Sequence, residues 1–332
     1  MDKWGGICLS VRILEIFISL EVLLLTDLKL IFLGTSASIP TIGRGLSSVA
    51  ILRDGELLLF DAGEGVQRSF LKARIGFNRK MKIFISHLHG DHCVGLLGLL
   101  QTMSMVQRDK PLTVFGPRGL IGFLHNNIRS LKFGLTFPLE VKIVRKGLVV
   151  ETGEYSIKAC IGQHRMKNFA YSLEEKNRPG IFDPKAAKKL KIPEGILWSK
   201  LQNGEHIEVN GKKINPNLVL GPGRKGRKIV ISGDTRPTPT IKRFISGADL
   251  AVLESTYFDD HKEKAKENFH MTAREAAEMA SEAEVNQLAL THFSSRYDDI
   301  KPHLSQASDI YPNLIVAEDF MVLNIPYPNE KS

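Results

Sequence analysis

The sequence is poor in cysteine. Its 332 residues include only three, Cys8, Cys93 and Cys160, which are widely spaced and form no Cys-x-x-Cys pair. This odd, scattered set argues against both a disulfide framework and a thiolate zinc site. We therefore expect a reducing, cytoplasmic location, with Cys93 serving as a small buried apolar residue.

Long uninterrupted hydrophobic runs are also scarce. Residues 7–25 form the one stretch that resembles a signal or membrane anchor, and Arg12, Glu15 and Glu21 interrupt it. Each charge near a bilayer centre costs about 2.5–3.5 kcal/mol on insertion scales, so we expect no membrane span. The segment is either a peripheral helix or the product of a misplaced start codon. We accordingly predict an N-terminal extension, residues 1–26, and a folded domain, residues 27–332.

The overall composition is that of a globular protein. A hydrophobic content of 43% in a chain of this length is enough for a sizeable core. The formal net charge of +9 favours a polyanionic partner, of which nucleic acid is the leading example. Charge alone provides solubility and steering and does not identify a function. No internal repeat or low-complexity tract is visible.

The most informative motif is His87-x-His89-x-Asp91-His92, which lies between a strand-like run at 82–85 and a helix-like run at 94–105. On an extended segment His87 and His89 point the same way and can reach one ion, whereas Asp91 and His92, past the bend, can serve a second. The alternative is that these residues only solvate a loop. Isolated histidines such as His125 and His206 are expected to be structural or exposed.

Three later residues each follow a predicted strand: His164, Asp234 and His292. Sheet scaffolds present ligands on the loops at strand ends, although each residue alone is weak evidence. Together with the first motif they make five imidazoles and two carboxylates. This set can fill the protein ligand positions of two ions, with Asp234 able to bridge them.

The remaining pattern predicts an α/β sandwich. Strand-like and helix-like runs alternate, and strands resume after residue 227. Expected strands are 28–33, 49–53, 57–60, 82–85, 112–115, 141–144, 228–232, 249–253 and 287–290, and expected helices are 65–74, 94–105, 119–130 and 271–284.

Residues 174–227 differ in character, because five prolines interrupt them and twelve lysines and arginines give them a strong positive charge. An ordinary explanation is a solvated lysine-rich loop. A long insertion inside a compact enzyme is better explained as a clamp for an extended anion. We therefore predict an inserted arm, whose basic surface Arg44, Arg79 and Lys82 extend.

With these motifs in view, the chain resembles the metallo-β-lactamase superfamily and, within it, the ribonuclease Z family. The resemblance covers residues 28–326 and includes Phe32-Leu33-Gly34-Thr35-Ser36-Ala37, Phe60-Asp61-Ala62-Gly63-Glu64-Gly65, Ser232-Gly233-Asp234-Thr235-Arg236, Glu254-Ser255-Thr256 and His270-Met271-Thr272-Ala273. It implies a four-layer αβ/βα sandwich with a protruding arm, assembled as a homodimer. The segment before residue 27 departs from the family pattern.

The resemblance also implies roles for individual residues. His87, His89 and His164 would hold one zinc ion, Asp91, His92 and His292 a second, and Asp234 would bridge them. Asp91 would accept a proton from the attacking water, and His270, held by Glu254, would protonate the leaving oxygen. Asp61 would steady the ligand loop, unless it caps the helix from Gly65. Similarly, His270 could simply precede the helix at 271–284.

The implied substrate is precursor tRNA, cut after the discriminator nucleotide to leave a 3′-hydroxyl. The arm would contact tRNA phosphates, so that recognition would be largely of tRNA shape. One rival is another hydrolase on the same scaffold, acting on a small phosphodiester, sulfate ester or thioester. A second rival is a noncatalytic RNA-binding member, against which the complete ligand set argues.

Overall fold

Two seven-stranded sheets form the centre of the molecule in the computed structural model, which describes residues 28–328. The first sheet has the order β18 (Val322–Asn324), β1 (Lys29–Gly34), β3 (Ser48–Arg53), β4 (Glu56–Phe60), β5 (Met81–Phe84), β6 (Leu112–Gly116) and β7 (Leu139–Ile143). The second has the order β17 (Leu314–Val316), β15 (Leu288–Thr291), β14 (Leu250–Glu254), β13 (Lys228–Ile231), β10 (Phe169–Glu175), β9 (Tyr155–Ile161) and β8 (Gly147–Glu151). Each sheet contains a parallel half, β4 to β7 and β13 to β17, of the kind that needs helices on its outer face.

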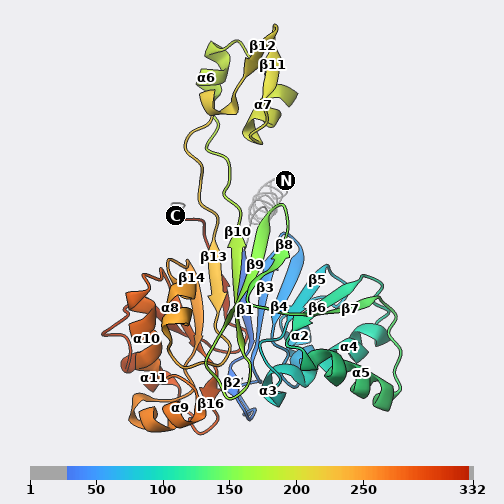
Figure 1. Cartoon of the computed structure of the whole chain (residues 1–332), viewed down its shortest axis with the longest axis vertical. Helices are drawn as coiled ribbons and strands as arrows, with labels where there is room; N and C mark the ends of the chain where they lie inside the picture. Colours follow the sequence, from blue (N-terminus) through green and yellow to red (C-terminus); the bar gives the residue numbers. More distant parts are fainter. Residues whose placement is uncertain (1–27, 329–332) are drawn as a thin grey trace, which may run out of the picture.

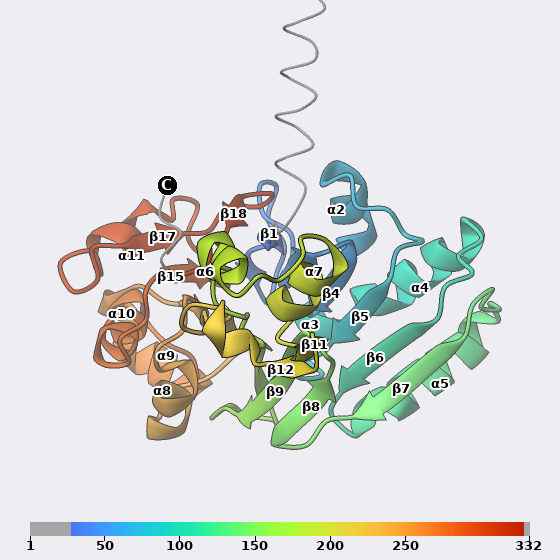
Figure 2. The same ribbon diagram turned by 90° about the horizontal axis from the view of Figure 1, so that it is seen from above.

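Helices supply those outer layers (Figure 2). The first sheet is covered by α2 (Val66–Lys72), α4 (Gly95–Met105) and α5 (Gly119–Leu131), and the second by α8 (Pro239–Ile245), α10 (Ala273–Glu282) and α11 (Lys301–Ser305). A third apolar cluster fills the space between the sheets. The predicted four-layer αβ/βα sandwich is therefore confirmed.

Aromatic packing between the two sheets fixes the edge from which the ligand motif emerges. Phe84 stacks on Phe60 and Phe115, with ring centroids 5.1 and 4.9 Å apart. Tyr171 of the second sheet donates its hydroxyl to the carbonyl of Ile85, 2.8 Å away, across the buried interface. The chain just before His87 is thus held by both sheets at once.

The predicted elements recur within one or two residues of their expected bounds, and the structure adds β8, β9, β10, β17, β18 and several short helices. Cys93 is buried, and burial raises the pKa of its thiol to about 12, as expected for an inert apolar residue. His125 and His206 are exposed. Between residues 28 and 328 no helix combines the length and apolar character that a membrane span requires. The prediction for residues 7–25 lies outside the described part of the chain.

The insertion is a small folded head carried on two extended stalks (Figure 1). The head contains α6 (Pro184–Lys189), α7 (Ile196–Gln202), β11 (Ile207–Val209), β12 (Lys212–Ile214) and the 3-10 turn η1 (Pro216–Leu218). It has its own apolar core, in which Ala187, Ile192, Leu201, Ile207 and Val219 are buried. The Asp183 carboxylate caps α6 by accepting hydrogen bonds from two backbone N–H groups.

One expectation about the basic surface is wrong. Lys82 lies on β5 and is only 19% exposed, because its ammonium forms an ion pair with Glu56 and donates a hydrogen bond to the hydroxyl of Tyr155. These partners neutralise the charge inside the sandwich. Lys82 therefore does not extend the RNA-facing surface of the arm.

Candidate metal centre and cleft

The seven predicted ligands converge at one edge of the sandwich. His87 and His89 follow β5, and Asp91 and His92 lie in the short helix α3 (Gly90–Cys93). The other three follow strands of the second sheet: His164 after β9, Asp234 after β13 and His292 after β15. Because the carboxyl ends of parallel strands share an edge, loops distant in sequence meet there.

One group of ligand atoms comprises His87, His89, His164 and Asp234, all within 4.8 Å of one another. His87 Nε2 lies 2.9 Å from His89 Nδ1, and His164 Nε2 lies 3.1 Å from the same nitrogen. Asp234 Oδ2 is 3.5 Å from His87 Nε2. Three ring nitrogens and one carboxylate oxygen therefore surround a common point.

A second group, also within 4.8 Å, comprises Asp91, His92 and His292. His92 Nε2 and His292 Nε2 are 3.2 Å apart, and each lies 3.3 Å from Asp234 Oδ1. The two oxygens of Asp234 thus face different groups. Oδ1 is buried and makes no hydrogen bond within the described residues, although an isolated buried carboxylate oxygen is costly.

This donor set fits metal cations. Nitrogen and carboxylate oxygen donors are those that Zn²⁺ prefers, and two cations would satisfy both oxygens of the buried Asp234. Burial holds the pKa of His87 well below its ordinary value, which favours the neutral ligating form. The residues therefore fit the cofactor that the resemblance implies.

The nitrogens that face away from this centre are also fixed, as metal-ligating histidines require. Four imidazoles use their Nδ1 atoms in this way, with the following partners: the Ser86 hydroxyl for His87, the Asp61 carboxylate for His92, the Phe269 carbonyl for His164 and the Thr256 hydroxyl for His292. The hydrogen-bond network assigns N–H to Nδ1 in each ring, which leaves Nε2 with its lone pair directed to the centre.

Asp61 supports the loop and does not cap α2. Its carboxylate accepts hydrogen bonds from the backbone N–H and hydroxyl of Ser86 and contacts His92 Nδ1 at 2.7 Å. Helix α2 begins after Gly65 without a side-chain cap. Asp61 has a φ of 58°, a strained conformation that the surrounding contacts maintain. The capping alternative is thereby excluded.

Backbone geometry aims Asp234 into the centre. The preceding Gly233 has a φ of 57°, and a Cβ there would lie 2.6 Å from Asn168 Oδ1. Only glycine meets both conditions without displacement. His292 has a φ of 61°, so a second ligand is also held in a strained left-handed conformation.

A carboxylate–histidine pair borders the centre. Glu254 is buried at the end of β14 and lies 2.9 Å from His270 Nδ1. Burial disfavours the charged imidazole, but the Glu254 carboxylate outweighs burial and raises the pKa of His270 to about 9. His270 lies just before the N-cap Thr272 of α10, and its ring faces the centre rather than forming part of the helix.

His270 also belongs to a third possible ligand group, with Asp234 and His292. Asp234 already belongs to the first group described above, and His292 belongs to the second. His270 therefore borders the centre without adding a separate ligand group of its own.

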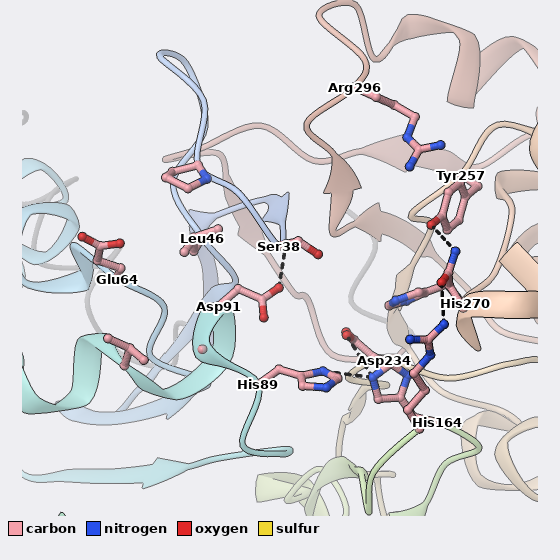
Figure 3. A pocket seen from close by; sticks show the side chains of 15 residues that line it. Ser38, Leu46, Glu64, His89, Asp91, His164, Asp234, Tyr257, His270 and Arg296 are labelled. Carbon is pink, nitrogen blue, oxygen red and sulfur yellow. Dashed lines mark hydrogen bonds and ion pairs between the residues drawn. The ribbon is translucent and has the colours of Figure 1, made fainter. Parts of the chain in front are cut away.

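The centre opens into a cleft of about 710 Å³ (Figure 3). Ser38, Leu46 and Glu64 line the side formed by the first half of the chain, and Tyr257 and Arg296 line the opposite side. The Ser38 backbone N–H donates to Asp91 Oδ2 at 2.7 Å and so orients that carboxylate.

Sequence reasoning missed the cleft residues Ser38, Tyr257 and Arg296. The Arg296 guanidinium lies 4.8 Å from the Tyr257 ring centroid, and its Nε donates to the Ser294 hydroxyl. Tyr257 follows the predicted site residue Glu254 closely in the sequence, and Arg296 follows His292. That proximity in sequence was the available signal.

Comparisons with known proteins agree with this geometry. Residues 28–178 match the family described as Anti-Pycsar protein Apyc1, and residues 204–293 match the beta-lactamase superfamily domain. Ribonuclease Z of Nitrosopumilus maritimus is 49% identical over 90% of this chain and 100% of its own, and ribonuclease Z of Methanosarcina acetivorans is 42% identical over 91% and 100%. The crystal structure of human tRNase Z, short form, superposes with a TM-score of 0.67 at 29% identity, covering 90% of this chain and 99% of that one. By this similarity the chain belongs to the ribonuclease Z family.

Proposed function

We propose that this protein is a zinc-dependent endoribonuclease that removes the 3′ trailer from precursor tRNA. It hydrolyses the phosphodiester after the discriminator nucleotide and leaves a 3′-hydroxyl on the tRNA. The observation that carries the proposal is the convergence of seven nitrogen and carboxylate ligands in a cleft of a ribonuclease Z family member. The free, buried thiols of Cys93 and Cys160 are consistent with a reducing cytoplasm.

Two zinc ions per subunit would be held as the two ligand groups suggest. His87, His89 and His164 would hold one, Asp91, His92 and His292 the other, and Asp234 would bridge them. When bound, zinc lowers the pKa of a water molecule and stabilises the charge that develops on the phosphoryl oxygens.

Asp91 would act as the base for the attacking water. Its Oδ2 accepts the Ser38 N–H and lies 3.5 Å from His292 Nε2. The backbone N–H of Ser38 thus holds this carboxylate at the cleft (Figure 3).

His270 would donate a proton to the leaving 3′ oxygen. Glu254 is held in turn by the backbone N–H of Thr235 and by the Thr256 hydroxyl, so the pair has little freedom to rotate. A carboxylate that orients and charges an imidazole is the arrangement expected for a general acid.

The arm, residues 174–227, would bind the tRNA body. Its head exposes a set of lysines that no apolar packing requires: Lys185, Lys188, Lys189, Lys191, Lys200, Lys212 and Lys213. Contacts between lysines and phosphates are insensitive to base identity, which suits recognition of a shape that all tRNAs share.

We also propose a homodimer in which one subunit's arm presents tRNA to the other's cleft. Apolar side chains stay exposed on α2, at Leu71, and at the end of α4, at Met105 and the following Val106. Such side chains are enriched where a protein surface is covered by a partner. Sedimentation equilibrium, which is independent of molecular shape, would give the mass directly.

The test uses one end-labelled precursor tRNA, with and without a chelator. The wild-type protein should release a single trailer in zinc-containing buffer and none after chelation. His89→Ala should abolish cleavage and reduce metal content while tRNA binding persists, and His125→Ala, an exposed histidine outside the cleft, should behave as wild type. Cleavage by His89→Ala at the wild-type rate would falsify the ligand assignment.

The same preparation separates the proposal from a small-molecule hydrolase. Bis(p-nitrophenyl) phosphate contains a phosphodiester but has nothing for the arm to bind. An RNA-processing enzyme should lose most of its kcat/KM on this truncated substrate. Equal efficiency on both substrates would favour the alternative hydrolase.

A further inference from the structure

The two stalks that carry the head are thin where they leave the second sheet. Two isolated antiparallel bridges, Arg178 with Arg224 and Phe182 with Leu220, connect them between the sheet and the head. A two-stranded ribbon of this kind is marginal by itself and does not fix the direction of a projecting head. Some other contact must hold the stalks relative to the core.

Glycines allow the two stalks to lie against each other. A Cβ on Gly180 would come within 1.9 Å of the Gly221 carbonyl oxygen, and one on Gly226 within 2.4 Å of the Glu175 carbonyl oxygen. This close approach keeps the pair narrow. Near the sheet, the Lys176 N–H donates to the Glu154 carbonyl, but the contacts within the pair do not reach the core.

A buried ion pair lies at the root of the stalks. The guanidinium of Arg227, where the return stalk ends, binds the Glu175 carboxylate through Nε at 2.7 Å and Nη2 at 2.9 Å. Arg53 of the first sheet reaches the same carboxylate at 2.9 Å. Arg227 and Glu175 are 4% and 3% exposed, so Arg227 is not one of the RNA-facing cations that its place in the arm suggests.

The C-terminal segment, Ile325 to Tyr327, covers this root. Arg227 Nη1 donates to the Ile325 carbonyl at 2.8 Å, and the Ile325 N–H donates to the Leu28 carbonyl beside β1. The Tyr327 ring lies between two guanidinium groups, with Arg178 Cζ 3.1 Å and Arg227 Cζ 3.7 Å from its centroid. One aromatic ring, anchored to the first sheet, therefore contacts both the outgoing and the returning stalk.

We propose that Tyr327, stacked between Arg178 and Arg227, is a positioning residue that holds the arm in a fixed direction relative to the cleft. This inference rests on the proposed function, because direction matters only if the head grips an RNA that must reach the cleavage site. Both faces of the ring are used, so its π face supplies attraction that an aliphatic side chain cannot. A held arm presents the substrate without an ordering cost at each encounter.

The test compares Tyr327→Ala, Tyr327→Leu and Tyr327→Phe. With precursor tRNA, Tyr327→Ala should raise KM about tenfold and change kcat little, since a loss of about 1.4 kcal/mol in binding corresponds to a factor of ten. Tyr327→Leu should resemble Tyr327→Ala, and Tyr327→Phe, which keeps the ring, should restore the wild-type KM. All three should hydrolyse bis(p-nitrophenyl) phosphate as the wild type does.

A matched control lies close by in the C-terminal part of the chain. Phe320 packs near the ammonium of Lys72 on α2, 5.2 Å from the ring centroid, and its backbone N–H donates to the Phe32 carbonyl of β1. Phe320→Ala should therefore leave the KM for precursor tRNA unchanged. A rise equal to that of Tyr327→Ala would show a general effect of the C-terminal packing and overturn the proposal.

A distance measurement tests arm direction without RNA. Spin labels at Glu208→Cys on the head and Glu278→Cys on α10 should give one narrow distance distribution in a protein that also carries Cys8→Ser, which leaves only the buried native thiols Cys93 and Cys160. The distribution should widen with Tyr327→Ala and stay narrow with Tyr327→Phe. An unchanged distribution with Tyr327→Ala, or loss of small-ester hydrolysis in that variant, would overturn the proposed role of Tyr327. If the wild type failed to cut precursor tRNA, the proposed function would fail, but the distance measurement would still test whether Tyr327 fixes the direction of the arm.

Discussion

The cleft and the arm are built in opposite ways. In the cleft, residues from both sheets place buried side chains with strained backbone angles, and most ligands have a second hydrogen-bond partner. In the arm, a small core carries exposed lysines on two thin stalks. Chemistry requires fixed donor positions, whereas recognition of a large anion requires reach and charge. The two regions should therefore respond differently to substitution.

The largest expected effect comes from Asp234→Asn, which removes the charge shared by both ligand groups. Cleavage of precursor tRNA should fall about a thousandfold or more, on the scale of losing a principal charge-stabilising group. Bound zinc, measured by elemental analysis, should fall in parallel. Asp309→Asn, at an exposed surface ion pair, is the control and should retain full activity.

Removal of the head should have the next largest effect and tests whether the arm and the cleft function separately. Joining residue 180 to residue 221 through two glycines deletes the head where the stalks already touch. Activity on precursor tRNA should fall by about a hundredfold, the scale of losing several phosphate contacts, while hydrolysis of bis(p-nitrophenyl) phosphate persists. Loss of both activities would mean that the arm and the cleft are one structural unit.

Asp61→Asn should have an intermediate effect within the cleft. The substitution keeps the shape of the side chain but removes the charge that holds His92, a change that typically lowers metal affinity or activity about 10–100-fold. Titration with zinc should show weaker binding and recovery of activity at high zinc concentration. Unchanged zinc affinity would contradict the supporting role of Asp61.

The smallest effect is expected for Lys212→Ala combined with Lys213→Ala on the exposed β12 strand. A plot of log affinity against log salt concentration has a negative slope, and each lost phosphate contact should reduce its magnitude by about 0.7–0.9. The kcat should not change, because the cleft is intact. Lys242→Ala, on the core helix α8, is the matched control and should leave the salt slope as it is.

Local sequence signals account for much of the fold. Strands β4, β5 and β6 and helices α4 and α5 follow short apolar runs whose period and length are visible in the chain. Helix α8 was missed although Thr238 and Pro239 form a recognisable helix start. The edge strand β8 was missed because it is short and largely exposed, so no burial pattern marks it.

The sequence by itself determined which ligand types are present and that they follow strands, because spacing and strand ends are local properties. Only the tertiary structure decided that Asp61 holds the ligand loop instead of capping α2, that Lys82 is neutralised by Glu56, and that Tyr327 joins both stalks to the core. Those contacts join residues far apart in the chain, and their geometry depends on how two sheets pack. No local pattern carries that information.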